Sequence, residues 1–122
     1  MHQSVLLIEE EPLLQPLIEA LALPCDFNIT QAITGFDGLR LATSLKFNLI
    51  FVDVMLSQVD GLDVLRLLRW QPLSQGSRLI AVSSTDSPTL RGNTYAAGAD
   101  YFLHPPYNAE AITAALNQPY SA

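Results

Sequence analysis

Acidic and hydroxyl side chains follow three separate apolar runs of the sequence. They are Glu9, Glu10 and Glu11 after the first run, Asp53 at the end of the second, and Ser83 and Ser84 after the third. Carboxylates held close together raise one another's pKa or recruit a cation. Oxygen ligands of this kind suit Mg²⁺, which takes one or two carboxylates and keeps several waters. The residue types therefore favour a divalent-cation site, provided that the three runs end at one place.

Five short apolar runs alternate with five helical patterns along the chain. The runs that we expect to be strands cover residues 5–8, 27–33, 48–53, 79–82 and 101–103, and the helical patterns begin near residues 12, 36, 62, 88 and 108. Short connections between alternating strands and helices predict a parallel sheet with helices on both faces, a doubly wound α/β fold. Ligands bind such sheets at the carboxyl ends of the strands. The acids and serines would then converge at one edge.

Each of these residues also has a simpler structural role. Glutamates after a strand commonly occupy a helix N-terminus, where acids favour the helix dipole. An aspartate that ends a strand is often a turn residue, and a serine there can bond its own backbone. The coincidence of all of them at one sheet edge favours a site, but it names no reaction.

Composition limits the class of protein. The chain has 122 residues, of which 49% are hydrophobic and 15% charged, so it can fold as one domain with a sizeable core. A net charge of −6 argues against direct binding to nucleic acid. Cys25 is the only cysteine, no apolar run could span a bilayer, and no lysine or arginine precedes Arg40. We therefore expect a cytoplasmic protein without a membrane segment.

Four segments together resemble the receiver domain of two-component response regulators. They read "VLLIEEEP", "NLIFVDVMLSQVDGLDVLRLLR", "RLIAVSS" and "AGADYFLHPPY", and the likeness runs from residue 4 to about residue 117. It implies a flavodoxin-like receiver fold with a five-stranded parallel sheet and five helices. It also implies one receiver domain over residues 1–122, either stand-alone or excised from a longer regulator. Such a domain is regulatory, and at most it catalyses its own phosphotransfer and dephosphorylation.

The resemblance assigns a role to several positions. Asp53 matches the phosphoacceptor, and Ser83 matches the residue whose hydroxyl contacts the phosphoryl group. Glu9 and Glu10 match the acidic pair that holds Mg²⁺ or Mn²⁺, and Met55 matches the residue whose backbone carbonyl is a metal ligand. Phe102 matches the aromatic switch residue. A histidine kinase or a phosphotransfer protein is the implied phosphodonor. The face made by the fourth helix, fifth strand and fifth helix is the implied surface for partners or for a homodimer.

One position departs sharply from the family. Receivers end the fifth strand with a lysine followed by a cis proline, and without a gap these positions are Pro105 and Pro106. The register is supported by the spacing, since 30 residues separate Asp53 from Ser83 and 22 separate Ser83 from Pro105. The only lysine of the chain, at position 46, precedes the third strand and so lies at the opposite end of the sheet.

His104 is the candidate substitute for the missing lysine, if the fifth strand is one residue short. In the ungapped register its side chain points to the opposite face of the sheet from position 105. Two smaller departures are Glu10, where the family has an aspartate, and Ser57, where a proline is usual. A lost charge-assisted hydrogen bond is worth about 1.5–3 kcal/mol, so phosphoryl binding would weaken.

Two functions of different classes remain open at this point. The first is a phosphorylation-dependent receiver, which the retained acids and Ser83 favour. The second is a degenerate receiver that acts as a phosphorylation-independent interaction module, which the missing lysine favours. A haloacid-dehalogenase-like phosphatase fits poorly, because that family needs a second aspartate where this chain has Met55.

Overall fold

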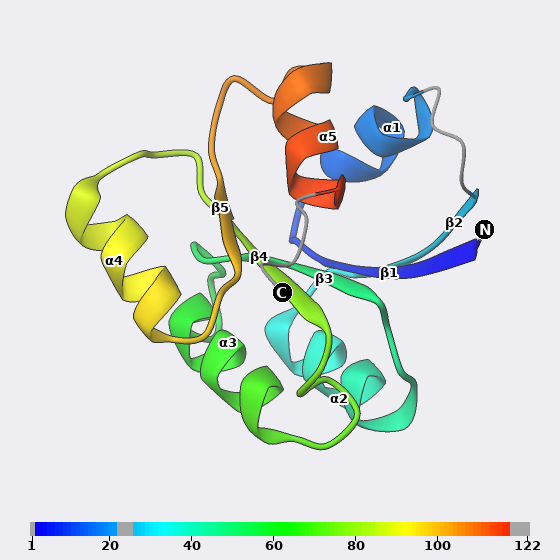
Figure 1. Ribbon diagram of the computed structural model, residues 1–122. Helices are drawn as coiled ribbons and strands as arrows, with labels where there is room; N and C mark the ends of the chain where they lie inside the picture. Colours follow the sequence, from blue (N-terminus) through cyan, green and yellow to red (C-terminus); the bar gives the residue numbers. More distant parts are fainter. Residues whose placement is uncertain (1, 22–25, 118–122) are drawn as a thin grey trace.

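The fold is a three-layer α/β sandwich, seen in a computed structural model that describes residues 2–21 and 26–117. Five parallel strands form one sheet in the order β2-β1-β3-β4-β5 (Figure 1). The strands are β1 (His2–Ile8), β2 (Asp26–Ala32), β3 (Leu49–Asp53), β4 (Arg78–Val82) and β5 (Tyr101–Leu103). The helices are α1 (Leu14–Glu19), α2 (Gly35–Ser44), α3 (Gly61–Trp70), α4 (Pro88–Ala96) and α5 (Ala109–Asn117). The predicted doubly wound α/β fold is confirmed.

The central strands form because they consist of uninterrupted aliphatic and aromatic residues that are buried on both faces. Alternate residues of β1, β3 and β4 belong to two separate core clusters. One cluster contains Ile50 and Val52 and packs against α2 and α3, while the other contains Leu49 and Phe51 and packs against α1 and α5. This division fixes the direction of every side chain that follows a strand, because successive residues point to opposite faces.

The strand order reverses beside β1, since the chain passes outward to β2 and then returns to β3 on the other side. Ile8 pairs with Val52, and Asp53 pairs with Val82. The residues just after β1, at the end of β3 and just after β4 therefore lie next to one another. This register therefore brings the acids and the serines together at one edge of the sheet, as predicted.

The residue before the helix supplies a side-chain cap in four of the five helices of the described residues, including α5, where the Asn108 side chain accepts from the Ala111 N–H at 2.8 Å. Thr34 before α2, Asp60 before α3 and Ser87 before α4 each accept a hydrogen bond from a backbone N–H in the first turn of the helix. Helix α1 is shorter than the predicted stretch, which ran to about Pro24. It ends at Glu19, and residues 22–25 lie outside the described part of the chain. Pro16 is its third residue, a position at which the missing N–H costs no helical hydrogen bond.

Helix α3 is tied to the loop before β5 by one arginine. Arg69 donates to the carbonyl oxygens of Gly98, Gln75 and Ser77 at 3.0–3.1 Å and forms an ion pair with Asp100 at 2.8 Å. The next residue, Trp70, ends the helix with 84% of its surface exposed. None of the helices among the described residues is long and apolar enough to cross a membrane.

Candidate functional site

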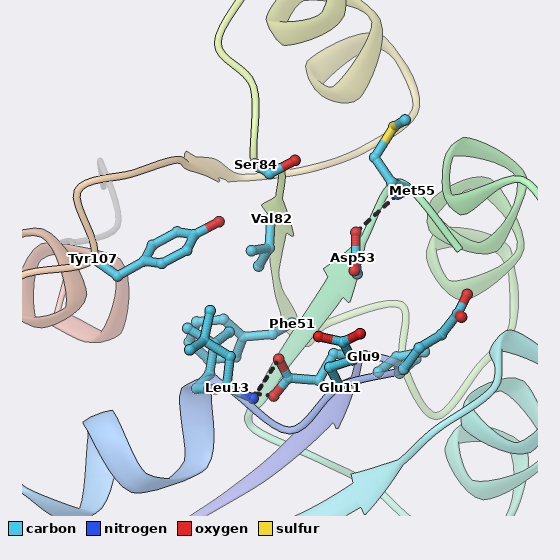
Figure 2. Close-up of a pocket in the computed structure, with 12 residues that line it drawn as sticks. Glu9, Glu11, Leu13, Phe51, Asp53, Met55, Val82, Ser84 and Tyr107 are labelled. Carbon is cyan, nitrogen blue, oxygen red and sulfur yellow. Dashed lines mark hydrogen bonds between the residues drawn. The ribbon is translucent and has the colours of Figure 1, made fainter. Parts of the chain in front are cut away.

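A pocket of about 350 Å³ opens at the carboxyl ends of β1, β3 and β4 (Figure 2). Its acidic side carries Glu9, Glu10, Glu11 and Asp53, and its other side is formed by Leu13, Leu14, Phe51, Val82, Ser84 and Tyr107. No basic side chain is among the described residues that line it. The predicted acids thus share one cavity, and no lining residue described here offsets their charge.

Asp53 ends β3 and projects into this pocket. Its Oδ1 accepts a hydrogen bond of 2.9 Å from the Met55 backbone N–H (Figure 2). Burial raises the pKa of Asp53, the bond from Met55 lowers it, and the charge of Glu10 raises it further, with a net upward shift. A cation beside Asp53 would favour the ionised form, which is the form that can act as a nucleophile.

Glu9 lies beside Asp53 but is also engaged with a helix. The residue is only 7% exposed, and its carboxylate accepts hydrogen bonds of 3.2 Å from the N–H groups of Leu13 and Leu14. It thereby caps α1, which has no side-chain cap from its own N-cap residue. Burial raises the pKa of Glu9, the backbone hydrogen bonds oppose this, and the charge of Asp53 adds to it.

Glu10 is turned toward the loop after β3. Its Oε1 accepts a hydrogen bond from the backbone N–H of Ser57. The Glu9 carboxylate is bonded to the start of α1, and the Glu10 carboxylate is bonded to the loop after β3. Among the described residues, no group of three acidic, histidine or cysteine side chains is close enough together to hold a metal ion. The donor set still fits Mg²⁺, because all the donors are hard oxygens, their charges repel and the ion needs only one or two carboxylates.

Ser84 lines the pocket and Ser83 is not among its lining residues, so the predicted contact of the Ser83 hydroxyl with a phosphoryl group stays a prediction. Ser83 is fully buried, and its hydroxyl accepts a 3.1 Å hydrogen bond from the Thr85 N–H. Strand alternation explains the difference, because Val82 and Ser84 point to the α1 and α5 side on which Asp53 lies, whereas Ser83 points to the other side with Phe102. The same alternation could have identified Ser84 in the sequence.

The predicted switch residue, Phe102, is buried under the β4–α4 region. The Arg91 guanidinium lies 5.6 Å from the centroid of its ring, and the His104 ring lies 5.8 Å from it. Nothing in this arrangement tests the switch itself, so that role stays a prediction.

His104 does not lie where the missing lysine would act. Strand β5 ends at Leu103, which pairs with Val82, so His104 lies beyond the ladder on the Phe102 side. Its Nε2 lies 3.6 Å from Asp86, and it lines a groove between β5 and α5 rather than the Asp53 pocket. The His104 side chain thus lies on the face of the sheet that the ungapped register of β5 predicts, which leaves the substitute role without support.

The chain after β5 returns to the pocket at Tyr107. The Pro105–Pro106 peptide bond is cis, as predicted for Pro106. The Tyr107 hydroxyl donates a 3.0 Å hydrogen bond to the Ser83 carbonyl oxygen, and the ring forms part of the pocket wall (Figure 2). Burial raises the pKa of Tyr107, and the charges of Asp53 and Glu9 raise it further. The role of Tyr107 could not be predicted, because the sequence does not show where its hydroxyl points.

Comparison with known proteins gives a consistent result. Residues 5–117 match the response regulator receiver domain family. Among curated proteins, Protein PilG of Pseudomonas aeruginosa is 26% identical over 113 residues, which cover 93% of this chain and 84% of PilG. Response regulator ArlR of Staphylococcus aureus is 30% identical over 113 residues, which cover 93% of this chain but only 50% of ArlR. The chain thus spans about half the length of several relatives that it matches.

One solved structure is similar to this chain in both fold and sequence. The receiver domain of sensor histidine kinase PA1611 from Pseudomonas aeruginosa has a TM-score of 0.81 and 26% identity, and the match covers 97% of each chain. That protein was crystallised with a magnesium ion coordinated in its active-site cleft.

Proposed function

The chain belongs to the response regulator receiver domain family of two-component signalling, and on that premise we propose that Asp53 accepts a phosphoryl group from a phosphohistidine. The observation that carries the proposal is the position of Asp53 at the end of the central strand, in an acidic pocket at the point where the strand order reverses. The phosphodonor would be a histidine kinase or a phosphotransfer protein.

The proposed chemistry is a phosphoryl transfer between two side chains. An Asp53 carboxylate oxygen attacks phosphorus, the phosphorus–nitrogen bond of the phosphohistidine breaks, and the freed imidazole takes up a proton. Glu9, Glu10, Asp53 and the Met55 carbonyl would hold Mg²⁺ or Mn²⁺, which when bound offsets the negative charge that develops on the phosphoryl oxygens. The chain itself contributes positioning, because β3 and the Met55 N–H orient the nucleophile.

Signalling beyond Asp53 is part of the same proposal. Ser83 and Phe102 would report the phosphoryl group to the surface formed by α4, β5 and α5. That surface carries a groove of about 360 Å³ between β5, an edge strand, and α5. We propose it as the site of partner binding or homodimer formation, with the domain acting in the cytoplasm as a regulator and not as a metabolic enzyme.

The direct test is incubation of the chain with Mg²⁺ and acetyl phosphate, followed by intact-mass analysis. One phosphoryl group should be added to the wild type and none to an Asp53→Asn variant. Beryllofluoride with Mg²⁺ should form the corresponding stable adduct, detected by changes in amide NMR signals around Asp53 and Phe102.

A different result would favour a phosphorylation-independent interaction module. If neither reagent modifies the wild type in saturating Mg²⁺, and a purified histidine kinase or phosphotransfer partner also fails to do so, the phosphoacceptor proposal is wrong. Sedimentation of the chain with and without beryllofluoride tests homodimer formation separately, because an unchanged sedimentation coefficient at high concentration would contradict it.

A further inference from the structure

Tyr107 lies in the wall of the Asp53 pocket, two residues after the position at which the family carries its lysine. Position 105 carries a proline, which has neither a charge nor a donor. Tyr107 follows two residues later, and its ring lies in the wall of the same pocket as Asp53 and Ser84. It is the largest polar side chain on the wall opposite the acids (Figure 2).

The Tyr107 hydroxyl has one hydrogen, and that hydrogen has a partner already. It is donated to the carbonyl oxygen of Ser83 over 3.0 Å. A phosphoryl group on Asp53 would bring charged oxygen acceptors into the pocket, and hydrogen bonds to charged acceptors are about twice as strong as those to neutral ones. Since a hydroxyl can rotate but cannot donate twice, the two acceptors compete for the same hydrogen.

We propose that the Tyr107 hydroxyl binds the phosphoryl group on Asp53 in place of the absent lysine and, in doing so, releases the Ser83 carbonyl. This inference rests on the proposed function of Asp53. It assigns Tyr107 two roles in one step, as a ligand of the phosphoryl group and as the link to Ser83, the first residue of the β4–α4 loop.

Electrostatics around Tyr107 agree with this arrangement. The negative charges of Asp53 and Glu9 act on the phenol, and together with burial they raise its pKa, so the hydroxyl stays protonated and able to donate. Among the other candidates, His104 lines a different groove and faces Asp86. Ser84 also lines the pocket, but it is Tyr107 whose hydroxyl is bonded to the Ser83 carbonyl oxygen, so Tyr107 is the residue that can link the pocket to Ser83.

Affinity for beryllofluoride in saturating Mg²⁺, measured by calorimetry, tests the inference. Tyr107→Phe removes only the hydroxyl, and loss of a hydrogen bond to a charged group should weaken binding at least about tenfold. Tyr95→Phe is the matched control, because Tyr95 is exposed on α4, and its affinity should stay within about twofold of the wild type. The affinity of Tyr107→Phe for Mg²⁺ alone should also stay within about twofold.

The coupling to Ser83 has its own signature. With carbonyl-labelled serine, the ¹³C shift of Ser83 in Tyr107→Phe reports a carbonyl without this hydrogen bond. On forming the beryllofluoride adduct, the Ser83 shift of the wild type should move toward that value. A shift that stays fixed would overturn the release of Ser83.

Adding the lysine back gives a double-variant test. In a Pro105→Lys background, the lysine should take over the phosphoryl group, so Tyr107→Phe should then cost less than about threefold in beryllofluoride affinity. A cost as large as in the wild-type background would show that the two side chains do not substitute for each other.

The outcomes separate the two proposals. If the wild type binds no beryllofluoride, the phosphoacceptor function fails and this inference fails with it. If the wild type binds and Tyr107→Phe binds equally well, only the role of Tyr107 is wrong. If Tyr107→Phe loses Mg²⁺ and beryllofluoride affinity together, the hydroxyl is structural, which also overturns the inference.

Discussion

Two residues that depart from the family pattern are partners in one hydrogen bond. Glu10 is one methylene longer than the usual aspartate, and its carboxylate reaches the backbone N–H of Ser57. That N–H exists because position 57 is not a proline, since proline has no amide hydrogen. The two departures therefore act together, and they hold a candidate metal ligand against the loop after β3.

Ser57→Pro should release Glu10 and raise the affinity for Mg²⁺ by about three- to tenfold, because the competing charge-assisted bond is removed. Ser57→Ala is the matched control, since it keeps the N–H and should leave the affinity unchanged. NMR titration with Mg²⁺ measures both variants. Equal affinities in the two variants would show that the bond to Ser57 does not restrain Glu10.

Position 105 is where the family carries a lysine, and the described residues that line this pocket include no positive charge. Pro105→Lys should increase the affinity for beryllofluoride by at least about tenfold and leave the affinity for Mg²⁺ nearly unchanged, since the new ammonium group contacts the phosphoryl analogue and not the metal. Pro105→Met, which has a long side chain without a charge, is the control. A similar gain with methionine would point to a change in the loop rather than to the charge.

The start of α3 packs closely against the end of β3, and this contact between two elements holds the backbone of Asp53 in place. Gly61 is the first residue of α3, and a Cβ there would lie 2.7 Å from the Asp53 carbonyl oxygen and closer still to the Cα of Val54. Because the obstructing atoms are backbone, no side chain can rotate to make room. A glycine is therefore required at this junction.

Gly61→Ala should destabilise the domain by about 2–3 kcal/mol, as overpacking against backbone does. Gly92→Ala is the matched control in α4, where nothing lies within 4 Å of the position that a Cβ would take. It should stabilise the domain by about 0.5–1 kcal/mol through helix propensity. Urea unfolding of both variants measures the difference, and a neutral Gly61→Ala would contradict the proposed role of the junction.

Arg69 should contribute more to stability than other arginines on the same helix. Its side chain is 30% exposed and satisfies three carbonyl oxygens and Asp100, so Arg69→Ala should cost about 2–3 kcal/mol. Arg66 pairs with Asp63, and both side chains are more than half exposed, so Arg66→Ala should cost less than about 1 kcal/mol. Equal losses in the free energy of unfolding for the two variants, measured with urea, would show that the hydrogen bonds and ion pair of Arg69 add no stability.

Strands and their order of appearance were predictable because each buried strand is an unbroken apolar run. The position of Asp53 and Glu9 at one edge followed from the parallel fold alone. The direction of Glu10 was not predictable, because it turns to Ser57 through a contact within a loop. The place of Ser84 in the pocket was predictable, because it follows from strand alternation after β4. Tyr107 was missed because its hydroxyl acts across 24 positions of sequence, on Ser83.

For the whole molecule, the acidic pocket links folding to pH. Burial raises the pKa of both Asp53 and Glu9 above their usual values of 3.8 and 4.5. A raised pKa in the folded state means that the contribution of these groups to stability is full below the usual values and is lost as pH rises through the raised ones. Each unit of pKa difference corresponds to about 1.4 kcal/mol.

Without Mg²⁺, the free energy of unfolding of the wild type should therefore fall relative to that of Asp53→Asn as the pH rises above about 4 and passes through the raised pKa values. Saturating Mg²⁺ should reverse the loss at pH 7, by about 2.7 kcal/mol at a hundred times its Kd, and should act less on the variant. Urea unfolding across this pH range measures both effects. Parallel pH profiles for the two proteins would contradict the linkage.

The place of Trp70 determines how such events can be observed. It is the only tryptophan of the chain, it is 84% exposed, and it ends a ten-residue helix whose first residue is the one that touches the end of β3. Ten residues of helix span about 15 Å, so the indole is remote from Asp53 and already surrounded by water. Its emission should stay at long wavelength and constant in intensity when metal or a phosphoryl analogue binds. A tryptophan fluorescence titration would therefore show no change even when the pocket is saturated with ligand.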